Sequence, residues 1–428
     1  MRLIPSGWAL SLMFAGTVAN VSTGAVRFVA LSFTSAILMV FVVLKLAETR
    51  AANVVRFGKW ANPFVWLFAV YGSIVLQELF LDDADVRAIV WTIPMGVLLA
   101  AAMILWQQGF VLHPRDLRIG LYGFFTAGIL LGVLSPTATK ACRDDKCSAF
   151  GSLYQGGFPH ENTMGYAASL AFIALATAGS QSRRHYRWGL WLLAAVPLTA
   201  AVFSGARIAI AGVFAAFAIN LGLLILKRHA LAILGFCVLI VTGSISLIYT
   251  SEIADFSFRG RRWIVLADSL PDFPLFGNGV TAWQDLQSSF LIPTTTHSVY
   301  GSVLVHGGYI AVFLYLVFIL LVALYARRST EKEIMPLWLF LVLQSVFYSI
   351  WEPVQLPTRG WVLVAVALAV RYRERQPSDV GHGRSRARSK NTQQFASRVS
   401  EPRVPSATQM HRERTSALLE SGGHRVRP

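Results

Sequence analysis

Arginine side chains at two places in the sequence could bind a phosphate or diphosphate. Arg207 stands at the start of an apolar run, directly after the segment 203–206. The segment 258–263 holds three more, Arg259, Arg261 and Arg262. A guanidinium group is planar and always charged, and its paired N–H donors match phosphoryl oxygens. The alternative is that these arginines contact lipid headgroups or pair with nearby carboxylates (Glu252, Asp255, Asp268 and Asp272).

A histidine further along the chain could move a proton. His297 lies in the segment 293–300, just before another apolar run. Imidazole titrates near neutral pH, so it is well suited to take a proton from a hydroxyl group. A histidine at the entry of a helix can also simply bond to a neighbouring carbonyl, and the sequence leaves both interpretations open.

A second histidine, His160, precedes Glu161 and Asn162 at the start of an apolar run. A His-Glu pair can indicate a metal, but only two ligands occur here, and no H-E-x-x-H pattern or cysteine pair completes a site. We therefore expect no metal. The spacing favours a helix cap in which Asn162 supplies the oxygen.

The three cysteines are too few for a disulfide framework. Cys237 falls inside an apolar run, where a buried thiol is expected. Cys142 and Cys147 lie five positions apart in a polar segment, and a small disulfide and two free thiols are both compatible with this spacing.

The elements that must position these residues are membrane-spanning helices. Of the 428 residues, 55% are hydrophobic and only 14% are charged, and apolar runs of about 20 residues, enough to cross a bilayer, recur almost throughout. The composition predicts an all-α polytopic membrane protein, with residues 1–375 as one transmembrane domain. About twelve spans are expected, at 6–22, 27–45, 62–80, 88–106, 119–135, 163–179, 189–203, 206–226, 230–250, 299–326, 336–350 and 358–371. The first run lacks a cleavage pattern and is taken as a span, not a signal peptide.

Lysine and arginine collect in every second connection, which the positive-inside rule assigns to the cytoplasm. Both termini are then cytoplasmic, in a multi-pass protein of the cytoplasmic (inner) membrane. Two long connections, 136–162 and 251–298, fall on the outer side. Arg207 and the cluster at 259–262 also fall there, against the charge bias, so something is expected to compensate their charge. The basic connections contain Lys45, Arg50, Arg56, Lys59, Arg115, Arg118, Arg183, Arg184, Arg187, Lys227, Arg228, Arg327, Arg328, Lys332, Arg371, Arg373 and Arg375.

The segment 376–428 has a different composition, rich in Ser, Arg, Gln, Pro and Gly. Such a segment cannot bury enough apolar surface to fold, so it is predicted to be a disordered cytoplasmic tail. It inflates the formal net charge of +16. Its basic residues are not interleaved with aromatic ones, so nucleic-acid binding is not indicated. Weak attraction to anionic lipids is the favoured interpretation.

Several segments, in order over about 203–325, resemble the O-antigen ligase and O-antigen polymerase superfamily of membrane glycosyltransferases. Arg207 after its small residues resembles the family's arginine entry to a span, and Arg259 four residues before Trp263 resembles its arginine-to-tryptophan spacing. The turn 274–279 (Pro-Leu-Phe-Gly-Asn-Gly) and His297, followed by Tyr300 and Gly307-Gly308, resemble later family motifs. The chain departs from the pattern at Ser298, where many members have Asn.

The resemblance implies a glycosyltransferase-C-like fold and transfer on the outer face of the membrane, without metal, nucleotide sugar or other cofactor. Residue by residue, it implies that Arg207, Arg259 and Arg262 bind the diphosphate of a polyprenyl-linked donor. His297 would be the catalytic histidine, with His160, Asn162 and Tyr300 as possible support. The partners would be a polyprenyl-diphosphate-linked glycan, a lipid or glycan acceptor and membrane lipids. The oligomeric state is not indicated.

The predicted function is therefore an inverting, O-antigen ligase-like glycosyltransferase of cell-surface polysaccharide biosynthesis. Three alternatives stay open: a polymerase of the same superfamily, a twelve-span secondary transporter and a non-catalytic scaffold of envelope assembly. The single dominant outer loop slightly favours ligase over polymerase. The lack of repeated halves and of a long central cytoplasmic loop argues against a transporter.

Overall fold

The computed structural model describes most of the predicted membrane domain. The described residues are 60–79, 86–107, 114–133, 138–143, 146–158, 160–226, 229–253, 255–269, 275–282, 297–329 and 337–351, with single positions at 32, 36, 39, 40, 286, 366 and 367. All belong to a compact unit, Met1–Glu374, that is separate from Arg375–Pro428. The predicted spans at 6–22, 27–45 and 358–371 lie almost wholly outside the described residues, and the predicted tail lies wholly outside them.

The nine predicted spans that fall within the described residues are all helices. Six of the described helices are long and apolar enough to cross a membrane: α5 (Pro114–Val133), α6 (Glu161–Gln181), α7 (Arg184–Phe203), α8 (Arg207–Ile225), α9 (His229–Thr250) and α12 (Val299–Ser329). Three more helices are apolar, but their apolar stretches are shorter than a membrane span: α3 (Pro63–Leu79), α4 (Val86–Gln107) and α13 (Leu337–Tyr348). The prediction of a mainly helical membrane protein is confirmed in this part of the chain.

Two elements within the predicted loops were not expected. The segment 136–162 contains a small antiparallel hairpin of β1 (Thr139–Ala141) and β2 (Ser152–Tyr154), which adds to the predicted helical fold. The segment 251–298 contains the amphipathic helix α10 (Asp255–Ser269). Both were missed because hydropathy windows of membrane length average out short elements.

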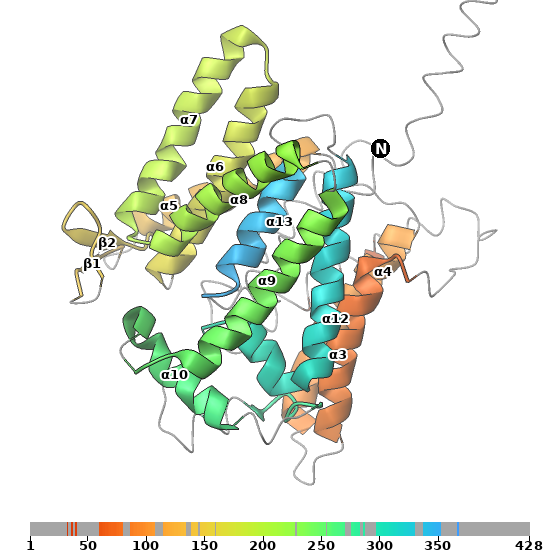
Figure 1. The fold of residues 1–428 in the computed structure, drawn as a ribbon. Helices are drawn as coiled ribbons and strands as arrows, with labels where there is room; N and C mark the ends of the chain where they lie inside the picture. The colour runs from red at the N-terminus through yellow and green to blue at the C-terminus, as the bar shows by residue number, and fades with distance from the viewer. Residues whose placement is uncertain are drawn as a thin grey trace, which may run out of the picture. The chain divides into compact units, whose positions relative to one another are not determined.

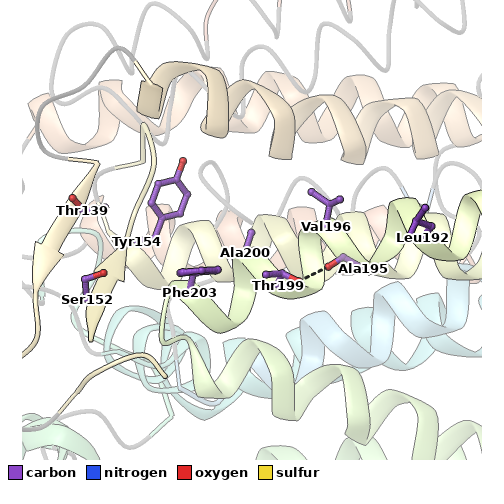
Figure 2. Close-up of a pocket in the computed structure, with 9 residues that line it drawn as sticks. All are labelled: Thr139, Ser152, Tyr154, Leu192, Ala195, Val196, Thr199, Ala200 and Phe203. Carbon is purple, nitrogen blue, oxygen red and sulfur yellow. Dashed lines mark hydrogen bonds between the residues drawn. The ribbon is translucent and has the colours of Figure 1, made fainter. Parts of the chain in front are cut away.

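Helix α6 lies at the centre of one half of the bundle and packs against α5, α7, α8 and α13. Figure 1 shows α6 and α7 as an antiparallel pair, with α8 crossing beside them. Most of α6 is buried, and its small residues allow close helix approach, as is typical of membrane helices. A Cβ on Gly165 would collide with Ala206 at the start of α8. The β-hairpin lies against the Phe203 end of α7 (Figure 2).

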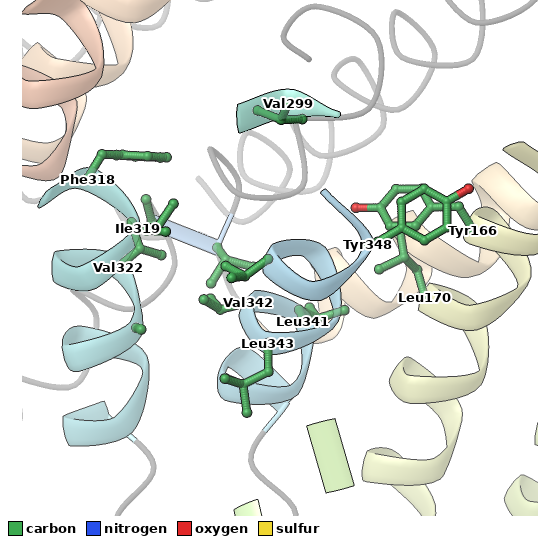
Figure 3. Packing of buried hydrophobic residues seen from close by; sticks show 14 of the residues in the cluster. Tyr166, Leu170, Val299, Phe318, Ile319, Val322, Leu341, Val342, Leu343 and Tyr348 are labelled. Atoms are coloured by element: carbon green, nitrogen blue, oxygen red, sulfur yellow. The ribbon is translucent and has the colours of Figure 1, made fainter. Parts of the chain in front are cut away.

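The other half of the bundle is centred on α12, which packs against α3, α9 and α13. In Figure 3, α12 contributes Phe318, Ile319 and Val322 to the core beside α13. On the other side of α13, Tyr348 stacks on Tyr166 of α6, with ring centroids 4.5 Å apart. Helix α13 therefore joins the two halves.

Helix α12 is broken near its start. Gly308 has φ 66° and ψ −165°, which separates a short first part from the long second part. The segment 275–279 fills the break: the N–H groups of Asn278 and Gly279 donate to the carbonyls of Val305 (2.9 Å) and His306 (3.1 Å). Across the break, the Ile310 N–H donates to the Leu275 carbonyl (3.2 Å). The motif glycines therefore form a close backbone contact between the loop and the helix.

A buried carboxylate holds the end of the same turn. Glu78 of α3 is 0% exposed and accepts the N–H groups of Val280 (2.6 Å) and Thr281 (3.3 Å). His306 Nδ1 lies 2.8 Å from the Gly279 carbonyl, so this nitrogen carries the proton and donates it. Helix α3 thus fixes the loop against α12 over a sequence separation of about 200 residues.

Gly277→Ala should destabilise the protein, because a Cβ at this position would fall within the backbone of Gly307 and His306. Overpacking of this kind costs about 1–3 kcal/mol. The measurement is thermal unfolding of the detergent-solubilised protein. The matched control is Gly243→Ala in α9, where no heavy atom lies within 4 Å of the added Cβ. Equal melting temperatures for the two variants would contradict the close contact.

Candidate functional site

The candidate residues lie where several elements meet at one end of the bundle. The Tyr348 hydroxyl, at the end of α13, donates to the carbonyl of Asn162 at the start of α6 (2.7 Å). The Val299 N–H, at the start of α12, donates to the Ser349 carbonyl (2.9 Å). The turn before α8 packs on the first turns of α6 through Gly165. These contacts bring the chain on either side of Arg207 and His297 to the same end of the bundle.

Arg207 begins α8 after a tight turn. Ser204 Oγ donates to the Ala201 carbonyl (2.7 Å) and accepts the Ala206 N–H (3.3 Å), and Gly205 adopts φ +63°. Ala206 offers no side-chain cap to the helix, and Arg207 is exposed. The N-terminus of a helix is electropositive, so a cation on its first residue adds to that field. The N-terminus of α8 and the side chain of Arg207 are therefore suited to bind an anion.

The β-hairpin contributes a disulfide. Cys142 and Cys147 are bonded, with a Cα–Cα distance of 4.7 Å, so the structure has the first of the two alternatives that their spacing allowed. Between them, Arg143 and Lys146 form an antiparallel bridge. This closed tip holds Lys146 over the start of α6.

Lys146 is a candidate that the sequence analysis missed. Its Nζ donates to Glu161 Oε1 (3.1 Å) and to Asn162 Oδ1, and its side chain is 10% exposed. Its Cε lies 3.5 Å from the place that a Cβ on Gly205 would occupy, so Lys146 borders the turn before Arg207. The signal was present in the sequence, because Lys140, Arg143 and Lys146 all lie in a connection assigned to the outer side.

Several basic side chains lie around this turn. Glu161, whose side chain is 3% exposed, lies 3.1 Å from Lys146 and 3.7 Å from an exposed Arg143. Lys146 also borders the turn that leads to Arg207, which is exposed at the start of α8. These basic side chains favour an anionic ligand at this end of the bundle.

His160, and not Asn162, caps helix α6. His160 Nδ1 accepts the N–H of Asn162 (3.1 Å), so the prediction that Asn162 supplies the capping oxygen is wrong. The side-chain oxygen of Asn162 is used by Lys146 instead. Within the described residues, no group of three or more His, Cys, Asp or Glu side chains is arranged to hold a metal ion.

His297 has an unusual backbone. Its φ of 50° makes it the one non-glycine residue with positive φ in the described part of the chain. Such strain concentrates at functional sites. The next residue, Ser298, accepts the Gly301 N–H on its hydroxyl (3.3 Å) and so caps the first part of α12. Tyr300 is 1% exposed and donates to the Val346 carbonyl (3.1 Å), which anchors this part of α12 to α13.

Helix α10 carries the arginine cluster. Arg259 and Arg262 lie three positions apart, on one side of the helix, and both are half-buried, whereas Arg261 is exposed. Trp263, four positions after Arg259, is 1% exposed and lies 6.0 Å from the Trp351 ring. Trp351 follows the Ser349 carbonyl that holds Val299. Helix α10 thus brings Arg259 and Arg262 to the region of His297.

The arrangement combines several cations with the imidazole of His297. Arg207 comes from α8, Arg259 and Arg262 come from α10, and His297 precedes α12. Guanidinium groups can neutralise a phosphate or diphosphate, and an imidazole can remove a proton from a hydroxyl. This end of the bundle therefore has the components for transferring a group from a phosphorylated donor to an alcohol.

The chain matches no protein-family model, no curated protein and no solved structure.

Lys146 and Glu161 should be energetically coupled, because their charges lie 3.1 Å apart and both side chains are largely buried. Lys146→Met and Glu161→Gln should each destabilise the protein. The double variant should lose less than the sum, with a coupling energy of about 1–3 kcal/mol. Unfolding of all four proteins under identical conditions measures this energy.

Lys140→Met on the same hairpin is the control, since Lys140 is exposed. It should have little effect on stability. Additive effects of the two single substitutions would refute the coupling.

Proposed function

We propose that this protein is a membrane glycosyltransferase that moves a glycan from a polyprenyl-diphosphate donor to an acceptor hydroxyl. The observation that carries the proposal is that the elements bearing Arg207, the α10 arginines and the strained His297 are joined by contacts at one end of the bundle. The contacts of Tyr348, Ser349 and Gly165 described above are among them. The resemblance of the motifs to O-antigen ligases adds the type of donor.

The charge pattern supports placing the site on the outer face of the cytoplasmic membrane. Helix α8 starts at Arg207 and spans 19 residues, which is about 28 Å at 1.5 Å per residue. Its other end leads to Lys227 and Arg228. That distance is close to the thickness of a hydrocarbon core, about 30 Å. If the basic end is cytoplasmic, then Arg207 faces outside, in a protein of about twelve spans with both termini inside.

The chemistry needs no nucleotide sugar. The acceptor oxygen attacks the anomeric carbon, its proton passes to His297, and the bond from that carbon to the diphosphate oxygen breaks. Arg207, Arg259 and Arg262 neutralise the charge that grows on the departing diphosphate. Attack from the face opposite the leaving group inverts the anomeric carbon. The diphosphate ester supplies the driving force, so neither ATP nor a metal ion is required.

The position after the histidine fits this assignment. Many members of the O-antigen ligase and polymerase superfamily, which this chain resembles, have Asn where this chain has Ser298. Ser298 caps the first part of α12 through its hydroxyl, and Ser and Asn are both favoured helix caps. The departure from the family pattern therefore preserves the local role.

A secondary transporter is the second candidate, and the break in α12 favours it. Discontinuous helices with freed backbone groups line the substrate sites of many transporters. In this chain, however, the segment 275–279 fills the break and satisfies the freed groups. We therefore favour the transferase.

Arg207→Ala and Arg259→Ala should each abolish glycan transfer from a lipid-diphosphate donor in a purified system, because the leaving diphosphate loses a counter-charge. His297→Ala should lower the rate by roughly 10²–10⁴ as the base is lost. Arg261→Ala, at the exposed position of α10, is the control and should retain activity. All reactions should proceed in EDTA.

Product length on a gel reports the reaction type, since one step of addition indicates a ligase and a ladder indicates a polymerase. Normal transfer by both Arg207→Ala and Arg259→Ala would contradict the donor site. An unchanged rate in His297→Ala would assign His297 a structural role.

A topology reporter fused after Arg262 should report a location outside the cytoplasm, because the proposal places α10 on the outer side of the membrane. A fusion after Arg228 should report the cytoplasm and serves as the control. A cytoplasmic result after Arg262 would remove the transferase proposal and favour the transporter.

A further inference from the structure

An open groove lies between the β-hairpin and one face of α7 (Figure 2). Its volume is about 640 Å³, which is within the range of about 300–1,000 Å³ that ligand sites occupy. The α7 residues that line it form one stripe at positions i, i+3, i+4, i+7, i+8 and i+11. These residues are Leu192, Ala195, Val196, Thr199, Ala200 and Phe203.

The floor of the groove is apolar. Small residues at 195, 199 and 200 lie between Leu192 and Phe203, which leaves a hollow along the helix. The Thr199 hydroxyl donates to the Ala195 carbonyl (2.9 Å), so its hydrogen is used within the helix (Figure 2). Leu192 and Val196 are 76% and 51% exposed. The groove thus suits a hydrocarbon chain that enters from the lipid side.

One end of the groove is polar. The hairpin contributes Thr139, Ser152 and Tyr154, all with hydroxyl groups. Phe203, at the same end, is four residues before Arg207 in the sequence. Lys146 borders the intervening turn at Gly205. The apolar stripe therefore ends close to the turn before the exposed Arg207, and this arrangement matches a lipid with an anionic headgroup.

The geometry points to one isoprenoid chain as the occupant: we propose that the groove holds the first isoprene units of the polyprenyl donor. This inference rests on the proposed function, which places the donor diphosphate at Arg207. The stripe covers 11 steps of one helix, about 16 Å at 1.5 Å per residue. A single stripe accommodates one chain, whereas a phospholipid has two chains to place.

A photoreactive polyprenyl monophosphate, carrying a diazirine near its phosphate end, tests the groove directly. The full-length protein is labelled in vesicles of phosphatidylethanolamine and phosphatidylglycerol, and the labelled peptides are mapped by mass spectrometry. Labels should fall within 192–203 and on the hairpin. Excess unlabelled polyprenyl phosphate should suppress them, and extra phosphatidylglycerol should not. Labels elsewhere, or equal suppression by phosphatidylglycerol, would overturn the proposal.

A matched pair of substitutions on α7 adds a second measurement. Val196→Trp fills the groove and should lower labelling about tenfold, because an isoprene unit loses its buried apolar contact. Leu193→Trp is the control, since Leu193 is 43% exposed on the same helix but outside the groove lining. Equal labelling of the two variants would count against the groove.

Glycan transfer, measured separately, distinguishes this inference from the proposed function. Suppose that the wild type transfers glycan, and that Val196→Trp matches it in both labelling and transfer activity. The groove assignment then fails, but the transferase proposal stands. If the groove is labelled but no polyprenyl-diphosphate glycan is transferred, the transferase fails and the donor assignment fails with it.

Discussion

The structure depends on how the backbone hydrogen-bonding groups at the break in α12 find partners. Interrupting a helix at Gly308 frees backbone groups that an apolar bundle cannot leave without partners. The segment 275–279 supplies them, through bonds from Asn278 and Gly279 to the carbonyls of Val305 and His306. The segment 275–279 and helix α12 approach so closely that Gly277 has no room for a Cβ. The need to pair these backbone groups therefore determines where the loop between α10 and α12 must lie.

The same constraint sets the position of the candidate site. Helix α10 and His297 stand on either side of the fixed segment in sequence, so anchoring that segment limits where both can go. Glu78 adds a second anchor from α3 by accepting the N–H groups of Val280 and Thr281. A fully buried carboxylate is costly unless its hydrogen bonds are made. Glu78 thus links the C-terminal end of α3 to the loop between α10 and α12.

Basic side chains give this end of the bundle its electrostatic character. Lys146 is already engaged by Glu161 and Asn162, whereas Arg207 stands exposed at the positive end of α8. A phosphorylated lipid would add negative charge beside Arg207 and place its hydrocarbon along α7. The proposed donor site and the proposed groove are therefore two ends of one amphiphilic surface, which begins at the turn 204–206.

The sequence by itself determined the helical segments and the positions of several chemical groups. Apolar runs of membrane length predicted α3 to α9, α12 and α13 because burial in lipid depends mainly on local composition. Cations on the unexpected side marked Arg207 and the α10 cluster. Tertiary structure decided the rest: the His160 cap, the role of Lys146, the Glu78 anchor and the burial of Tyr300. These depend on partners from 2 to 203 positions away, and hydropathy carries no information about which backbone groups will meet.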